Sequence, residues 1–362
     1  MIDNNELTAY LSRGIKNIIT HAIRGSLKNP REAAFLLGYQ KHSTKAGKLR
    51  SGFEDEGRHI PAFLISSITQ TCNLHCKGCY ARSNGICCDE KGSEILSSAK
   101  WSNIFKQAEG LGIGFNLLAG GEPLMRRDVI DEAAKQKKTI FPIFTNGTMI
   151  DEEYIEVFDT HRNLIPVISI EGDEQATDER RGNGIYRVLS EKMDKIAKRH
   201  ILFGASITVT AKNINQVTDS SFIEDLKKKG CKLIFFIEYI PVSEGTQNLV
   251  LSDIDRNMLE QKVNLLKKVY KSILFLSFPG DEEKMGGCLA AGRGFIHINP
   301  YGGVEACPFS PYGDCSLKNS TLIDVIKSPF FEKLRMNLLS GEHNGGCALF
   351  NQQEKVEELL QI

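Results

Sequence analysis

The pattern of hydrophobic and polar positions divides this chain into a helical start, an alternating middle and a short β-rich end. Over residues 4–25, apolar residues recur at the spacing of one helix face, at Leu7, Leu11, Ile15, Ile18, Ile19 and Ala22. Residues 41–57 are polar and contain glycine, which predicts a linker or loop. The chain therefore opens with an amphipathic helix before its main domain.

From residue 62 the pattern alternates between short apolar runs and longer amphipathic stretches. The apolar runs predict six strands, at residues 62–68, 115–119, 139–144, 164–169, 203–209 and 232–239. The stretches after them predict six helices, at residues 101–110, 129–138, 151–159, 186–198, 222–229 and 253–271. Strands that alternate with helices indicate an α/β fold with a parallel sheet, and six units favour a partial (β/α)6 TIM-type barrel over a full eight. Such sheets place their chemistry at the carboxyl ends of the strands.

Composition excludes several functions for the 362 residues. Lysine plus arginine equals aspartate plus glutamate at 45 each, so no charge excess predicts nucleic-acid binding. No apolar run is long enough for a transmembrane helix, and the polar start does not resemble a signal peptide. We therefore expect a cytoplasmic protein. The basic N-terminal helix predicts packing on the main domain, with peripheral membrane contact as the alternative.

Ten cysteines are many for a chain without an export signal, and in a reducing compartment such residues more often bind metal or react than form disulfides. Cys231 precedes an apolar strand and is interpreted as a small buried residue. The adjacent pair Cys87-Cys88 predicts a plain loop, because sequence neighbours rarely ligate one metal together.

Cys72, Cys76 and Cys79 lie close together, directly after the first predicted strand. This spacing supplies three thiolates locally, so a four-iron cluster would keep one iron open to a ligand that is not protein. A zinc site usually pairs Cys-x-x-Cys with a second pair elsewhere. The triplet therefore favours an iron–sulfur cluster over zinc.

C-x-x-x-C-x-x-C at the end of a first strand resembles the signature of radical S-adenosylmethionine (SAM) enzymes. The resemblance implies that Cys72, Cys76 and Cys79 hold a 4Fe-4S cluster whose open iron is chelated by SAM. One position departs from the family pattern. The residue before the third cysteine is often aromatic or His in the family and is Gly78 here. We therefore assign no adenine contact to residue 78.

Further resemblance lies at the next strand ends. Gly120-Gly121-Glu122-Pro123 matches the segment that receives the amino group of SAM in the family, although alone it would predict a plain turn. Asn146, in an Asn-Gly turn pair, would face the adenosine, and Ser169 and Glu171 would contact the ribose or methionine part of SAM. Arg181, or else Arg180, would pair with the SAM carboxylate. Glu238 and Tyr239 end the sixth predicted strand and could face the substrate, and an ion pair is the alternative for Glu238.

The composition changes after residue 280. Two short strands flank the turn residues 299–303, which predicts a hairpin. Cys288, Cys307, Cys315 and Cys347 surround it and could hold a second 4Fe-4S cluster or a structural zinc. This region resembles the C-terminal auxiliary-cluster domains called SPASM and Twitch, which implies one auxiliary 4Fe-4S cluster. His297, in the middle of a strand, is expected to pack rather than to ligate.

The sequence thus predicts three parts: a helical extension over residues 1–61, a radical SAM partial barrel over 62–280 and an auxiliary-cluster domain over 281–362. The resemblance implies an enzyme of oxidoreductase or transferase type that cleaves SAM to a 5′-deoxyadenosyl radical, which abstracts hydrogen from a substrate C–H bond. Flavodoxin or ferredoxin would donate the electron. The substrate could be a peptide, a small molecule or a lipid. The alternative is a non-catalytic iron–sulfur or zinc protein with a redox or regulatory role.

Overall fold

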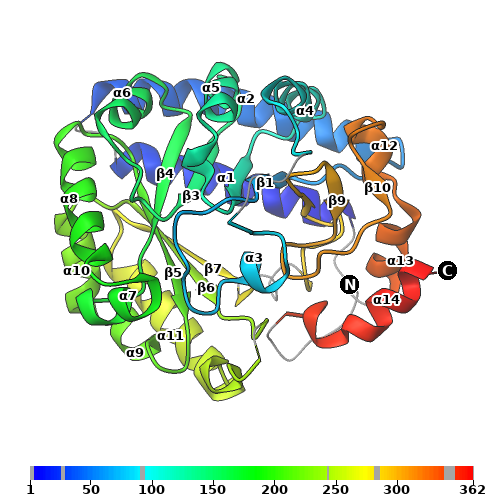
Figure 1. Cartoon of the computed structure of the whole chain (residues 1–362). Helices are drawn as coiled ribbons and strands as arrows, with labels where there is room; N and C mark the ends of the chain where they lie inside the picture. The colour runs from blue at the N-terminus through cyan, green and yellow to red at the C-terminus, as the bar shows by residue number, and fades with distance from the viewer. Residues whose placement is uncertain are drawn as a thin grey trace.

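A computed structural model describes residues 4–25, 29–89, 94–242, 244–280, 286–337 and 347–361. Its centre is a ten-stranded sheet in the order β10-β9-β8-β1-β2-β3-β4-β5-β6-β7. Neighbours from β8 through β1 to β7 are parallel, whereas β9 and β10 are antiparallel to their neighbours. Figure 1 shows the strands curving around an open centre, with the helices forming an outer ring. The predicted α/β partial barrel is confirmed.

The barrel strands are β1 Phe63–Thr69, β2 Asn116–Gly120, β3 Phe141–Thr145, β4 Leu164–Ser169, β5 Gly204–Val209, β6 Leu233–Glu238 and β7 Leu274–Phe278. The six predicted strands are present within one or two residues at each end. The seventh, β7, extends the sheet beyond the predicted six. Most residues of β1 to β6 are buried, because helices cover the outer face of the sheet, whereas β7 at the sheet edge is mostly half-buried.

The outer helices are α4 Ser98–Gly110, α5 Arg127–Lys135, α6 Glu152–Thr160, α7 Glu174–Arg181, α8 Ile185–Lys198, α9 Ile214–Val217, α10 Ser220–Lys228 and α11 Asp253–Val269, with the 3-10 turns η1 Pro123–Met125 and η2 Gln247–Leu249. Their starts follow from side-chain caps. Ser97 caps α4, Asp151 caps α6, and Ser252 with Asp255 forms a capping box on α11. Helix α7 was not predicted.

Two helices, α1 Asn4–Gly25 and α2 Pro30–Asp55, close the amino-terminal end of the barrel. Helix α1 is seen behind the strands in Figure 1. Ile19, Leu36 and Tyr39 of these helices pack against Ile165 and Phe235, which point into the barrel. The predicted amphipathic helix therefore packs on the main domain. The predicted loop at residues 41–57 is wrong, because Asn29 caps α2 with Pro30 in its first turn and the helix continues to Asp55.

Polar contacts tie this helical floor to the loops that enter the strands. Tyr39 Oη donates to the carbonyl of Gly114, before β2, and the Arg50 guanidinium donates to the carbonyl of Gly112. Glu32 Oε2 and Arg162 Nη1, before β4, form an ion pair of 3.1 Å in which both side chains are buried. No described helix is long and apolar enough to cross a membrane.

The C-terminal region continues the same sheet. Strand β8 Phe295–Ile298 pairs in parallel with β1, so that Phe63 lies beside Phe295, and β9 Gly303–Glu305 forms the predicted hairpin with it. Strand β10 Cys315–Ser316 pairs with β9. The chain then adds α12 Leu322–Ile326, α13 Pro329–Asn337, the turn η4 Phe350–Gln352 and α14 Gln353–Gln361.

Candidate functional site

The three clustered cysteines lie in the loop between β1 and the short helix α3 Tyr80–Ser83, at the carboxyl end of the barrel. Figure 1 shows α3 near the centre of the ring of helices. Cys72, Cys76 and Cys79 are half-buried free thiols, and Cys79 directly precedes α3. The structure therefore places these thiols in one loop at the barrel mouth. We call residues 70–79 the cysteine loop.

Arg82, in α3, holds the cysteine loop in place through hydrogen bonds to the loop backbone. Its Nη2 atom donates to the carbonyl of Leu74 at 3.0 Å and to that of Cys72 at 3.4 Å. These bonds fix the backbone on both sides of Asn73 and place a guanidinium beside the thiol of Cys72. Positive charge close to a thiol favours the thiolate, which is the form that ligates metals.

Cys87 is a neighbour of this loop that the sequence did not reveal. Cys87 is buried, and its thiol donates a hydrogen bond to Cys72. That bond, aided by Arg82 and by Asn146, lowers the pKa of Cys72 to about 6 against the opposing effect of burial. The pKa of Cys87 rises in return, and burial raises that of Cys76. The prediction of a plain loop at residues 87–88 missed this contact.

The glycine turn after β2 is built against the cysteine loop. Gly121 N–H donates to the carbonyl of Thr69 at 2.9 Å, and Glu122 N–H donates to that of Thr71 at 2.8 Å. A Cβ on Gly121 would lie 2.1 Å from the Thr71 carbonyl oxygen, and Gly120 has a φ of +128°. Only glycine allows this close approach of two backbones. The buried Pro123 then starts η1.

Glu122 is buried, and both of its carboxylate oxygens already have protein donors. Oε1 accepts from the Leu124 N–H at 3.0 Å and from Thr145 Oγ1 at 2.7 Å, while Oε2 accepts from the Asn146 N–H at 2.7 Å. Burial raises the pKa of Glu122 to about 7, and these three donors act against that rise. The side chain thus fixes the ends of β2 and β3 relative to each other, while its contact with a SAM ammonium stays a prediction.

Asn146 extends this arrangement to the cysteines. Its Nδ2 atom lies 3.8 Å from Cys72 Sγ and donates to Asn73 Oδ1 at 2.8 Å, while its Oδ1 accepts from Thr148. The predicted site residue Asn146 is therefore brought to the cysteine loop. Ser169, at the end of β4, is half-buried and lies beside Ser206 of β5.

Glu171 lies between two arginines at the start of the region that follows β4. Its Oε1 accepts from Arg180 Nη1 at 2.6 Å and from Arg181 Nε at 2.9 Å, whereas its Oε2 is buried and has no hydrogen-bond partner among the described residues. Arg181 Nη1 lies 4.0 Å from Cys76 Sγ. Two guanidinium groups against one carboxylate leave a net positive charge beside that thiol. The structure thus brings Glu171, Arg180 and Arg181 together.

Arg180 also fixes the cysteine loop directly. Lys77 N–H donates to the Arg180 carbonyl at 2.9 Å, and Arg180 Nε donates to the Lys77 carbonyl at 3.1 Å. This reciprocal pair joins the loop to the end of α7. The sequence suggested Arg180 only as a substitute for Arg181, and the structure gives the two residues different contacts.

The second set of cysteines lies around the β8–β9 hairpin. Cys288 and Cys307 are buried, whereas Cys315, on β10, and Cys347 are half-buried. Within the described ranges, no three His, Cys, Asp or Glu side chains converge closely enough to hold one metal ion. Cys72, Cys76 and Cys79 are among the described residues, so the same holds for the first set. A cluster of several irons could hold thiolates that lie farther apart.

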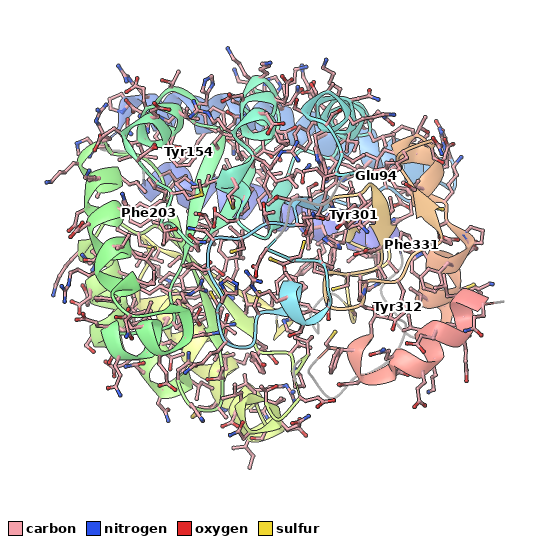
Figure 2. The ribbon with its side chains drawn as sticks, in the orientation of Figure 1. Glu94, Tyr154, Phe203, Tyr301, Tyr312 and Phe331 are labelled. Atoms are coloured by element: carbon pink, nitrogen blue, oxygen red, sulfur yellow. The ribbon has the colours of Figure 1, made fainter. Side chains whose placement is uncertain are left out.

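Contacts across the barrel mouth connect the two cysteine sets. The Tyr80 ring packs on Phe309 with a centroid distance of 5.0 Å. Burial, followed by the nearby thiols of Cys79 and Cys307, raises the pKa of Tyr80. Tyr301, labelled in Figure 2, donates from the hairpin to Gln70 at the start of the cysteine loop. Tyr80 therefore lies between a thiol of each set.

Three further residues singled out from the sequence are Glu238, His297 and Cys231. Glu238 forms an ion pair of 3.1 Å with Arg256, as one of its two predictions stated. His297 is fully buried and packs as predicted: its Nδ1 donates to Glu305 Oε2, and its Nε2 bonds to Ser67 Oγ. Cys231 is fully buried, as predicted.

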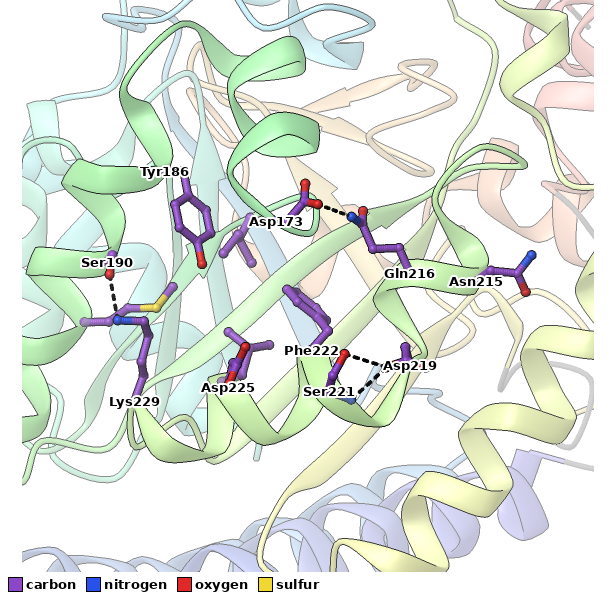
Figure 3. A pocket seen from close by; sticks show the side chains of 13 residues that line it. Asp173, Tyr186, Ser190, Asn215, Gln216, Asp219, Ser221, Phe222, Asp225 and Lys229 are labelled. Carbon is purple, nitrogen blue, oxygen red and sulfur yellow. Dashed lines mark hydrogen bonds between the residues drawn. The ribbon is translucent and has the colours of Figure 1, made fainter.

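A cavity of about 370 Å³ lies away from this site, between α8 and α10 on the outer wall of the barrel (Figure 3). It is lined by Tyr186 and Phe222, and by polar side chains that bond to one another, such as Asp173 with Gln216 at 2.6 Å. None of the described cysteines lines it. This cavity therefore lies apart from the cysteine loop.

Comparison with known families agrees with the geometry at the barrel mouth. Residues 66–234 match the radical SAM superfamily. This segment of the chain is therefore similar to the radical SAM superfamily. The radical SAM match begins within β1 and ends within β6, so it includes the cysteine loop, the glycine turn and the Glu171 region. The family uses a 4Fe-4S cluster and SAM.

Two curated relatives and one solved structure illustrate the similarity. The chain is 24% identical to Fe-coproporphyrin III synthase of Methanosarcina barkeri, over 69% of this chain and 61% of the relative. It is also 24% identical to the sporulation killing factor maturation protein SkfB of Bacillus subtilis, over 54% of this chain and 47% of the relative. The chain thus spans about half to three fifths of the length of these relatives.

The fold resembles that of SuiB from Streptococcus suis, solved bound to S-adenosylmethionine. The TM-score is 0.68 at 16% identity, covering 89% of this chain and 83% of SuiB. A second SuiB structure, bound to precursor peptide SuiA, gives a TM-score of 0.66 at 17% identity and covers 92% of this chain and 82% of SuiB. The likeness in fold therefore extends beyond the residues that match the superfamily.

Proposed function

We propose that this chain is a radical SAM enzyme whose active site is the barrel mouth around Cys72, Cys76 and Cys79. The observation that carries the proposal is the cysteine loop itself. Three free thiols are held there by Arg82, by the glycine turn and by the Lys77–Arg180 bonds. This arrangement fits a cluster with one open iron, because the protein offers three thiolates and places the cations Arg82 and Arg181 beside two of them.

The surroundings fit SAM as the ligand of that iron. SAM carries an ammonium, a carboxylate and hydroxyl groups, and the site offers the partnerless buried Oε2 of Glu171, the amide of Asn146 and the guanidinium of Arg181. When bound, the cluster and SAM supply one-electron cleavage to a 5′-deoxyadenosyl radical, which takes a hydrogen atom from a substrate C–H bond. The chain's own residues orient the bound groups and keep water out.

Each predicted contact residue has a place in this proposal. Gly120, Gly121 and Pro123 shape the turn beside the loop, and Glu122 holds that turn against Asn146. Ser169 lies at the end of β4, where SAM would be bound. Flavodoxin or ferredoxin would supply the electron in a cytoplasmic, reducing compartment, which suits the ten free cysteines.

Cys288, Cys307, Cys315 and Cys347 would hold an auxiliary 4Fe-4S cluster within residues 281–362. The position of Tyr80 between Cys79 and Cys307 supports this, since it places one of these thiols close to the first site. Reconstituted protein should then hold roughly eight irons per chain. A protein that holds four irons and one zinc ion would contradict the auxiliary cluster and leave the first site intact.

For the substrate, we favour a peptide over a porphyrin-like small molecule. SuiB was solved with a precursor peptide, and the likeness in fold to that structure covers 92% of this chain. The small-molecule alternative rests on the similarity to Fe-coproporphyrin III synthase. The lipid alternative loses its support, because the apolar residues Leu7, Leu11 and Ile19 of α1 are buried against the barrel.

SAM cleavage without substrate tests the proposed function. Anaerobically reconstituted protein, given dithionite and SAM, should release 5′-deoxyadenosine, measured by liquid chromatography. Cys76→Ala should release none, because two thiolates cannot present the open iron. Cys231→Ala is the matched control, since Cys231 is a buried cysteine remote from the loop, and it should retain release. Equal release from Cys76→Ala would contradict the site, and no release from wild type would favour a non-catalytic protein.

A further inference from the structure

Tyr239 follows strand β6 and packs against the cysteine loop from the opposite side of the barrel mouth. Its N–H donates to the carbonyl of Val209 at 2.9 Å, and the residue is 4% exposed. Its ring lies on Gly78, whose φ is +66°. A Cβ at residue 78 would lie 2.7 Å from the Tyr239 hydroxyl oxygen and 2.9 Å from its ring. Glycine at position 78 thus allows the ring to reach the loop.

The hydroxyl of Tyr239 has no hydrogen-bond partner among the described residues, although its oxygen is buried. A buried polar group without a partner carries a free-energy cost, and such groups in native proteins usually mark a bound ligand or water. A phenylalanine would fill the same space without that cost. The hydroxyl therefore indicates an acceptor that the protein itself does not provide.

The location of the hydroxyl restricts what that acceptor can be. Gly78 lies between Cys76 and Cys79, so any group that both thiolates hold lies against the same short stretch of loop. An iron–sulfur cluster carries sulfur atoms, both inorganic and cysteinyl, that accept hydrogen bonds. Such bonds are one of the factors that set the reduction potential of a cluster.

We propose that the Tyr239 hydroxyl donates a hydrogen bond to a sulfur atom of the cluster held by Cys72, Cys76 and Cys79. The inference rests on the proposed function, since it requires that cluster. The donor stabilises the added negative charge of the reduced cluster more than it stabilises the oxidised cluster. Tyr239 therefore raises the reduction potential and eases delivery of the electron.

Tyr239→Phe removes the hydroxyl and keeps the ring, so it isolates the bond. We expect the equilibrium for one-electron reduction to shift about three- to tenfold toward the oxidised cluster, where tenfold corresponds to a potential 59 mV lower. Potentials are measured by anaerobic titration followed by electron paramagnetic resonance without SAM. The signal absent from a Cys72, Cys76, Cys79→Ala triple variant identifies the cluster. Tyr270→Phe, a buried tyrosine on the outer wall, is the matched control and should not shift the potential.

Two results would overturn the inference. An unchanged potential in Tyr239→Phe would show that the ring only packs. An unchanged potential together with weaker SAM binding would assign the hydroxyl to SAM instead. Reduced iron loading does not spoil the measurement, because the potential is read from loaded molecules alone. If wild type shows no signal that the triple variant lacks, the proposed function itself fails before Tyr239 is compared.

Discussion

The two ends of the barrel differ in how they are packed and in how far their polar groups are paired. At the amino-terminal end, α1 and α2 fill the opening with apolar side chains, and their polar groups bond to the loops before the strands. At the carboxyl end, the loops are tied to one another by backbone bonds, yet the thiols are half-exposed. Glu171 Oε2 and Tyr239 Oη have no hydrogen-bond partner in the part of the chain that the structure describes. The difference shows that the floor provides stability and that the mouth keeps bonding capacity free for bound groups.

The largest expected effect lies at the floor, in the buried pair of Glu32 and Arg162. Arg162→Ala would leave Glu32 buried without its cation, and we expect unfolding to become easier by about 3–5 kcal/mol. Urea denaturation of cluster-free protein measures this. Iron bound per folded molecule should not change. A loss of iron binding with normal stability would contradict the assignment of stability to the amino-terminal end of the barrel and of binding to its carboxyl end.

Glu32→Gln together with Arg162→Met is the control for that measurement. The double variant removes both charges and leaves no unpaired ion, so its loss should be smaller than that of Arg162→Ala. An equal loss in the two variants would show that the contribution comes from packing and not from the pair.

A smaller effect is expected at the mouth, from Glu122. Glu122→Ala removes the acceptor for Leu124, Thr145 and Asn146, and a cavity that water can enter limits the loss of stability to about 1–3 kcal/mol. Glu122→Gln keeps part of the bonding and should lose less. Titration of SAM into both reconstituted variants decides whether Glu122 also contacts SAM. Weaker SAM binding by a stably folded Glu122→Gln protein would show that Glu122 contacts SAM in addition to holding the ends of β2 and β3 together.

The smallest effect is a pH dependence from the same residue. Burial raises the pKa of Glu122 to about 7, above its value in the unfolded chain. Stability from the protonated carboxyl is therefore present at low pH and is lost as pH rises through the range between the two values. Wild type should lose stability relative to Glu122→Gln by about 1 kcal/mol between pH 5 and pH 6. A constant difference in unfolding free energy across that range would show that Glu122 is already ionised.

The sequence predicted the parts of the molecule that depend on local pattern. Strand β4 was predicted at its observed bounds, because buried parallel strands form apolar runs. The cysteine triplet and the glycine turn were found because their spacing is itself the signal. The loop predicted at residues 41–57 failed, since its glycines are tolerated within a helix that is stabilised by tertiary packing on the barrel.

Contacts between distant segments were not predictable in this way. Cys87 reaches Cys72, Arg82 reaches Leu74, and Tyr239 reaches Gly78 only because the folded loops bring them together. Arg82 could have been noticed as a cation one helical turn beyond the third cysteine. The sequence placed Tyr239 at a strand end that could face the substrate, but nothing local indicated its contact with Gly78. The bracing contacts of Glu122 likewise depend on β2 and β3 being neighbours.

Because β8 pairs in parallel with β1, the C-terminal region covers the edge that β1 would otherwise form in the barrel sheet. If the chain were cut near residue 280, β1 would lose the neighbour that covers its outer edge, and its unpaired N–H and C=O groups would face solvent. Ser67 would lose its bond to His297 at the same time. That exposed edge is the kind of surface through which sheets of separate molecules join. The strand that leads into the cysteine loop thus depends on residues more than two hundred positions later to remain part of a single, non-aggregating molecule.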